Sequence, residues 1–107
     1  MTQNFAVDPQ IQHHFSDGVY AKQMHLPKGY AAYTHKHAYS HLAILGSGIA
    51  QVTLNRETSV YTAPACINIV AGVTHEILAL EDITWYCIHA TLETDPGKID
   101  EIAIGAR

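Results

Sequence analysis

The chain is divided into short segments rich in β-branched, aromatic and aliphatic residues, and each segment is closed by residues that favour turns. Little of the sequence shows the periodicity of an amphipathic helix. The expected strands are Val19–Leu26, Ala31–His37, His41–Leu45, Ile49–Leu54, Ser59–Thr62, Cys66–Val70, His75–Leu80 and Ile83–Leu92. Many short strands at this spacing predict an all-β sandwich or barrel.

The two ends of the chain are expected to differ from this β-rich region. At 107 residues the chain predicts a single domain, with its barrel over residues 19–92. Residues 1–18 are polar and interrupted by proline and glycine, which indicates an N-terminal arm. Residues 93–107 form a tail whose apolar patch, Ile99, Ile102 and Ile104, predicts either a short helix or an added edge strand.

Composition and charge exclude several classes of partner. The net charge is −4, and the six Lys and Arg residues are scattered, so the basic face that nucleic-acid binding requires is absent from the sequence. No apolar run approaches the ~20 residues of a membrane span, and the N-terminus does not resemble a signal peptide. We therefore expect a cytoplasmic protein that binds neither nucleic acid nor membrane.

Two further compositional features concern association and redox state. Only 15% of the residues are charged, and this low charge on a small domain indicates apolar surface covered by a second copy, as in a homodimer. Two cysteines, Cys66 and Cys87, are too few for a disulfide scaffold. We expect both to be buried, reduced thiols.

A group of four histidines, His35, His37, His41 and His75, indicates the chemistry of the protein. Neutral imidazole is a common metal ligand, and three of these residues lie in the run T-H-K-H-A-Y-S-H. On a strand, His35 and His37 face the same side. The pattern predicts a mononuclear metal centre inside a small β-fold, and the alternative is a set of histidines that only fills the core.

His41 cannot join this group along one straight strand. It would lie roughly 20 Å from His35, whereas metal–imidazole bonds are about 2.1 Å long. We therefore expect a bend near Ala38–Ser40 that returns His41 on the neighbouring strand, with His75 facing the group from across the barrel. A helix would instead place His37 and His41 on one face, but the flanking glycines and β-formers favour strands.

The spacing of the first histidines resembles a motif of the cupin superfamily, G-x5-H-x-H-x3–4-E-x6-G. The chain has G-YAAYT-H-K-H-AYS-H-LAILGS-G from Gly29 to Gly48, with His41 at the glutamate position. The second cupin motif usually contains P-x-G-x-x-H followed by three residues and then N. Here it is V-A-G-V-T-H ending at His75, with Val70 in place of the proline and Ala79 at the asparagine position.

The resemblance covers about residues 19–92 and implies a cupin-type double-stranded β-helix, or jelly-roll barrel. It also implies one divalent metal ion, Mn, Fe, Ni, Cu or Zn, held by His35, His37, His41 and His75. With His41 replacing a carboxylate, the ligands leave the charge of the ion uncompensated, which favours anionic substrates or hydroxide. The whole sequence also resembles small single-domain cupins of phages and prophages.

Several other residues are candidates for positions around this centre. His89 shares strand parity with Trp85 and Cys87, so it is expected to face the interior, either as a second-shell proton carrier or as a hydrogen-bonded core residue. Tyr33, Tyr39 and Trp85 are expected to wall a substrate pocket. Glu76 follows a ligand directly and should point to the other face of its strand, and the three histidines outside both motifs are expected on the surface: His13, His14 and His25.

The sequence leaves three functions open. The first is a metal-dependent enzyme acting on a small oxygen-chelating molecule, with dioxygenase-like chemistry ahead of lyase or isomerase chemistry. The second is a metal-dependent small-molecule binding module without turnover. The third is a structural accessory protein of a phage-like assembly, in which the metal stabilises the barrel.

Overall fold

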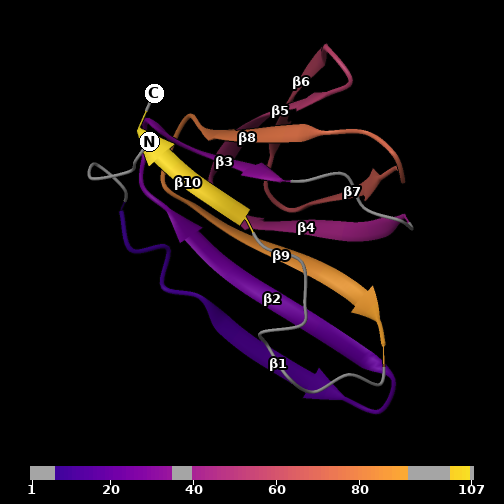
Figure 1. Ribbon diagram of the computed structural model, residues 1–107. Helices are drawn as coiled ribbons and strands as arrows, with labels where there is room; N and C mark the ends of the chain where they lie inside the picture. The colour runs from indigo at the N-terminus through magenta and orange to yellow at the C-terminus, as the bar shows by residue number, and fades with distance from the viewer. Residues whose placement is uncertain (1–6, 35–39, 92–101, 107) are drawn as a thin grey trace.

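The computed structural model describes residues 7–34, 40–91 and 102–106, and these residues form ten strands in two antiparallel sheets. Sheet A has the order β1-β2-β9-β4-β7, and sheet B has the order β10-β3-β8-β5-β6 (Figure 1). The strands of sheet A are β1 Gln12–Ser16, β2 Val19–Leu26, β9 Ile83–Ala90, β4 His41–Ser47 and β7 Ala65–Ile69. Those of sheet B are β10 Ile102–Ala106, β3 Tyr30–Thr34, β8 His75–Ala79, β5 Ile49–Leu54 and β6 Glu57–Thr62.

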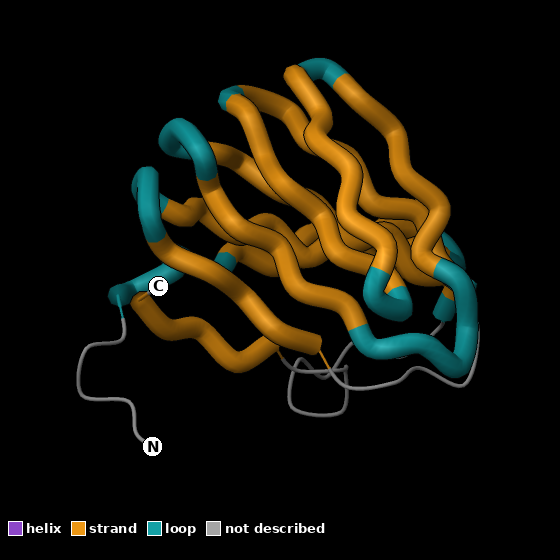
Figure 2. The backbone as a smooth tube through the Cα atoms, turned by 90° about the horizontal axis from the view of Figure 1, so that it is seen from above, coloured by secondary structure: helices purple, strands orange, loops and turns teal. Residues whose placement is uncertain are grey.

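The chain crosses between the two sheets at nearly every connection. Among the ten strands only two consecutive pairs, β1–β2 and β5–β6, lie in the same sheet. The β5–β6 hairpin has a two-residue turn, Asn55-Arg56, in which both residues have positive φ (49° and 73°), as a tight hairpin requires. The other connections switch sheets, so the two sheets lie as facing layers (Figure 2) and enclose one interior.

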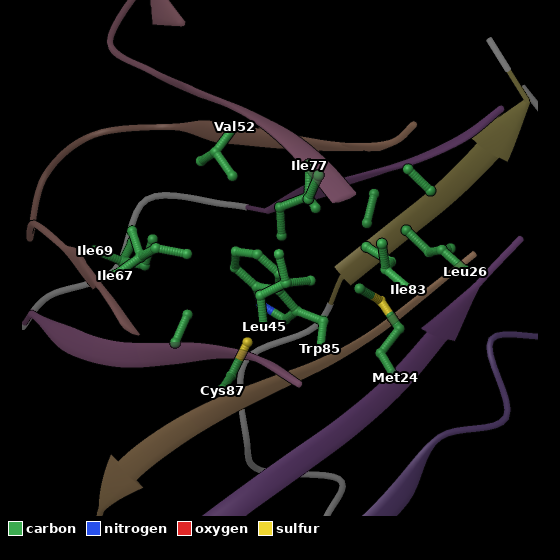
Figure 3. Packing of buried hydrophobic residues seen from close by; sticks show 14 residues of the cluster. Met24, Leu26, Leu45, Val52, Ile67, Ile69, Ile77, Ile83, Trp85 and Cys87 are labelled. Carbon is green, nitrogen blue, oxygen red and sulfur yellow. The ribbon is translucent and has the colours of Figure 1, made fainter. Parts of the chain in front are cut away.

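Strict alternation of side chains builds the core between these layers. In β9 every second residue from Ile83 to His89 is buried, and β2, β4 and β8 alternate in the same way. Sheet A contributes Trp85 and Leu45, sheet B contributes Ile77 and Val52, and all four are at most 1% exposed. Figure 3 shows the Trp85 indole in the middle of this apolar cluster.

The prediction of an all-β fold is confirmed; the structure corrects two details of it and decides between the two alternatives for the tail. Residues 12–16, expected within an N-terminal arm, form the edge strand β1, because their backbone pairs with β2 although all five side chains are exposed. In the tail, the added edge strand β10 forms beside β3. Cys87 is buried as expected, but Cys66 is exposed because it lies on the outward side of β7, between the inward Ala65 and Ile67.

The outer face of sheet A exposes large apolar side chains, among them Val19 and Leu42 at 43% and 51%. The structure contains a single chain and does not test the predicted homodimer, which stays a prediction. Among the described ranges there is no helix that could span a membrane.

Gly48 is the point at which the chain leaves β4 for β5 in the opposite sheet. Its φ is +88°, and a Cβ atom built on it would lie 2.0 Å from the carbonyl oxygen of Asp82, in the turn between β8 and β9. The Gly48 carbonyl also accepts a hydrogen bond of 3.0 Å from the Ala63 amide. Only glycine permits both this backbone conformation and this close approach.

We predict that Gly48→Ala lowers the free energy of unfolding by about 3 kcal/mol or more, because left-handed strain of roughly 1–2 kcal/mol adds to a backbone clash. Gly18→Ala is the matched control, since Gly18 has a similar φ of +75° but nothing within 4 Å of the added Cβ. Urea unfolding of the two variants measures the difference, and equal losses of stability would contradict the assignment of Gly48 as a close-contact site.

Candidate functional site

Two of the predicted metal ligands face each other across the interior. His41 is the first residue of β4 in sheet A, and His75 is the first residue of β8 in sheet B. Both side chains are buried, at 6% and 4% exposure, and their ring centroids are 6.2 Å apart. The expectation that His75 faces His41 from across the barrel is therefore confirmed.

His41 reaches this position by a route that differs from the expected one. We expected it on the strand next to the one preceding the bend, but β3 and β4 lie in different sheets, and β3 pairs with β8 and β10 instead. The expected bend near Ala38–Ser40 lies largely outside the described residues, as do the predicted ligands His35 and His37 and the predicted pocket residue Tyr39. The described part of β4 is a strand from its first residue, which excludes the helical alternative at His41.

A third buried imidazole lies against His41. His89 on β9 is 2% exposed, and its ring stacks on that of His41 with a centroid distance of 4.5 Å and an interplanar angle of 26°. The strand register explains the contact, because Leu42 pairs with Ile88 and the next residues along each strand are His41 and His89. The expected inward orientation of His89, shared with Trp85 and Cys87, is confirmed.

A cavity of about 310 Å³ lies on the outer face of sheet A, on the opposite side of the sheet from the buried rings of His41 and His89. It is found where β4 begins and β9 ends, and most of its lining comes from residues that alternate outward along β2, β4, β7 and β9. One of the lining residues, Ser40, accepts a hydrogen bond of 3.0 Å from the Ala71 amide, which holds the β4 entry against the segment after β7. The lining residues are Val19, Ser40, His41, Leu42, Asn68, Ile88, His89 and Ala90.

The imidazoles at this site are donors of a type that metal ions use. With metal–nitrogen bonds of about 2.1 Å, two imidazoles on one ion have ring centroids up to roughly 6.5 Å apart, a limit reached when the two nitrogens lie on opposite sides of the ion. The 6.2 Å between the ring centroids of His41 and His75 lies just within that limit. Among the described residues no group of three or more His, Cys, Asp or Glu side chains could hold a metal ion, and the predicted ligands His35 and His37 lie outside those residues.

The two remaining pocket candidates do not line the cavity on the outer face of sheet A. Trp85 is fully buried in the apolar core, and its indole N–H has no hydrogen-bond partner among the described residues. Tyr33 is 42% exposed and pairs with Glu76, which points away from the interior as expected from its position after His75. Tyr33 instead lines a second cavity of about 420 Å³ at the outer side of sheet B.

Tyr20 is a residue near the site that the sequence analysis missed. It lies on β2 opposite His89, is fully buried, and its ring centroid is 6.0 Å from that of His89. Its hydroxyl group hydrogen-bonds Nδ1 of His13 at 2.7 Å. Burial of the phenol, together with a smaller effect of the nearby Cys87 thiolate, raises the pKa of Tyr20 to about 12.

Comparison with solved structures identifies the architecture. A cupin superfamily protein from Desulfitobacterium hafniense superposes with a TM-score of 0.66 over 80% of this chain and 82% of its own, at 16% identity. A cupin-2 domain-containing protein from Shewanella frigidimarina gives 0.63 over 84% of each chain at 18% identity. A cupin-2 domain-containing protein from Halorhodospira halophila gives 0.70 over 97% of this chain and 73% of its own, at 14% identity. The chain has the cupin fold.

The predicted cupin-type jelly-roll barrel is thus confirmed at the level of fold. No protein-family model and no curated protein matches the sequence. At identities of 14–18% the likeness to these cupins concerns the fold alone. The phage-like origin and the all-histidine ligand set of this chain stay predictions.

The environment of Tyr20 predicts a pH dependence of stability. The fold raises the pKa of Tyr20 from 10.0 to about 12, so the phenol ionises at lower pH in the unfolded chain than in the folded one. Ionisation therefore favours the unfolded chain, and the free energy of unfolding falls as pH rises through that interval. Below pH 10 Tyr20 is protonated in both the folded and the unfolded chain, so burial of the neutral phenol contributes fully to the free energy of unfolding. We expect the stability of the wild type, relative to that of Tyr20→Phe, to fall between pH 10 and about 12, measured by urea unfolding.

Proposed function

We propose that this cupin binds one divalent metal ion through His41 and His75, with His35 and His37 as further imidazole ligands, and uses it to hold a small oxygen-chelating molecule. The observation behind the proposal is the pair of buried imidazoles from opposite sheets, whose ring centroids are 6.2 Å apart. Neutral imidazole is a common metal ligand, so two such rings that face each other in the interior are candidates to share one ion.

The residues at the site have separate parts in this proposal. His41 and His75 donate nitrogen to the ion, and His89 keeps one face of the His41 ring covered. When bound, the metal would supply a positive charge to the chelating oxygens and, if it is a redox metal, a route for oxidation by O2.

Oxidation by O2 is the reaction that we place first, and lyase or isomerase chemistry is second. Both need the metal, but proton transfer also needs a base. Among the described residues, the buried polar or charged side chains are His41, His75 and His89, with no Asp, Glu or Lys. This set of side chains supports redox chemistry over reactions that depend on a carboxylate base.

We predict that metal-free protein prepared without an affinity tag takes up about one equivalent of a divalent ion. His41→Ala and His75→Ala should each weaken binding by roughly 100-fold or more, since even outer-shell changes cost 10- to 100-fold. His25→Ala, on the outward side of β2, is the control and should bind like the wild type. Isothermal titration with several metals measures this, and wild-type protein that binds none would exclude the proposed function.

Removing the metal from the titrated protein with a chelator distinguishes an ion that serves the binding site from one that stabilises the fold. If the fold survives chelation, as judged by circular dichroism, the metal serves the site. Complete unfolding on chelation would instead support the structural accessory function, because the ion would then be part of the folding free energy.

We further predict that metal-loaded protein consumes O2 with a β-diketone, a catechol or another enolisable compound, and that His75→Ala does not. An oxygen electrode measures the consumption, with the metal-free protein as the blank. A ligand that perturbs the spectrum of the bound metal in air without consumption of O2 would indicate a binding module and contradict the enzymatic part of the proposal.

A further inference from the structure

Four aromatic rings lie in one row across the inner face of sheet A, one on each of four neighbouring strands. They are His13 on β1, Tyr20 on β2, His89 on β9 and His41 on β4. Successive ring centroids are 5.8, 6.0 and 4.5 Å apart, with interplanar angles of 21°, 25° and 26°. The four rings therefore form a continuous stack from the edge of the sheet to the candidate metal site.

The outer end of the stack is anchored by a directed interaction. The hydroxyl group of Tyr20 and Nδ1 of His13 are 2.7 Å apart, a distance typical of a strong hydrogen bond. Phe15, two residues along β1, contacts the Tyr20 ring at a tilt of 33° with centroids 5.0 Å apart. Strand β1 thus holds Tyr20 in place from two sides of the phenol.

Stacking restricts how each ring can turn. A ring covered on both faces cannot rotate about χ2 without losing those contacts, and Tyr20 and His89 each have a ring of the stack on two sides. His41 has His89 on one face, so the direction of its nitrogen atoms depends on where His89 sits. A metal ligand needs such a fixed direction, because coordination tolerates little angular error.

We propose that Tyr20 and His13 are positioning residues for His41, and that the stack transmits the docking of edge strand β1 to the metal site. The inference rests on the proposed function, because it assigns His41 a metal to bind. The ring of His13 contacts that of Tyr20, and the ring of Tyr20 contacts that of His89, so each residue acts on His41 through the ring next to it.

His14 provides a matched control on the same strand. It is also an exposed histidine, and its Nε2 makes a side-chain hydrogen bond of 3.0 Å across to β2, with Oε1 of Gln23. As the neighbour of His13 along the strand, it points to the opposite face of sheet A. Its removal costs a comparable β1–β2 contact but leaves the stack intact.

Co²⁺ titration, followed by the visible absorption of the bound ion, tests the proposal. We expect Tyr20→Phe and His13→Ala each to weaken Co²⁺ binding by about tenfold and to shift its absorption bands. His14→Ala should change affinity by less than about twofold and leave the bands in place. The proposal would be overturned if His13→Ala behaved like His14→Ala. If His13→Ala does not fold, Tyr20→Phe provides the same test.

A measurement on the metal-free protein separates this inference from the proposed function. The imidazole proton resonances of His41 should move in His13→Ala and stay unchanged in His14→Ala, because only the first change disturbs the stack. Unchanged His41 resonances in both variants would overturn the inference. Wild-type protein that binds no Co²⁺ would refute the proposed function, while the resonances would still test the stack.

Discussion

The packing of two five-stranded sheets around one shared interior is the constraint on which the rest of this molecule depends. Each strand presents alternate side chains to that interior, so the residue type at each inward position decides whether that part of the interior is apolar or polar. Over most of the layer these positions hold Trp85, Leu45, Ile77 and similar residues, which stabilise the fold by burial. At one end of β4, β8 and β9 they hold histidines instead.

The histidines occupy positions at which apolar residues would contribute more to stability. A buried imidazole must be desolvated and satisfied, whereas a leucine of similar size needs neither. His41, His75 and His89 nevertheless lie within one continuous layer, and their contacts with one another are ring contacts of 4.5 and 6.2 Å. The placement of three imidazoles together at one end of the interior is the feature on which the proposed metal site rests.

Strand parity explains which expectations from the sequence hold and which do not. The inward direction of His89 and the outward direction of Glu76 follow from alternation along a strand once one residue is placed. Tyr33 does not face the interior as a pocket residue would, because it pairs with the outward Glu76. The expected burial of Cys66 is wrong because its neighbours Ala65 and Ile67 occupy the inward positions.

The sequence by itself determined the β-strands, the turns between them and the types of donor at the site, because these depend on residues close together along the chain. It also indicated the cupin fold through the spacing of glycines and histidines from Gly29 to His75. Only the tertiary structure decided that residues 12–16 pair as an edge strand, and that His13 and Tyr20 join His89 and His41 in one stack. These contacts depend on the order and register of strands distant in sequence, which local propensity does not specify.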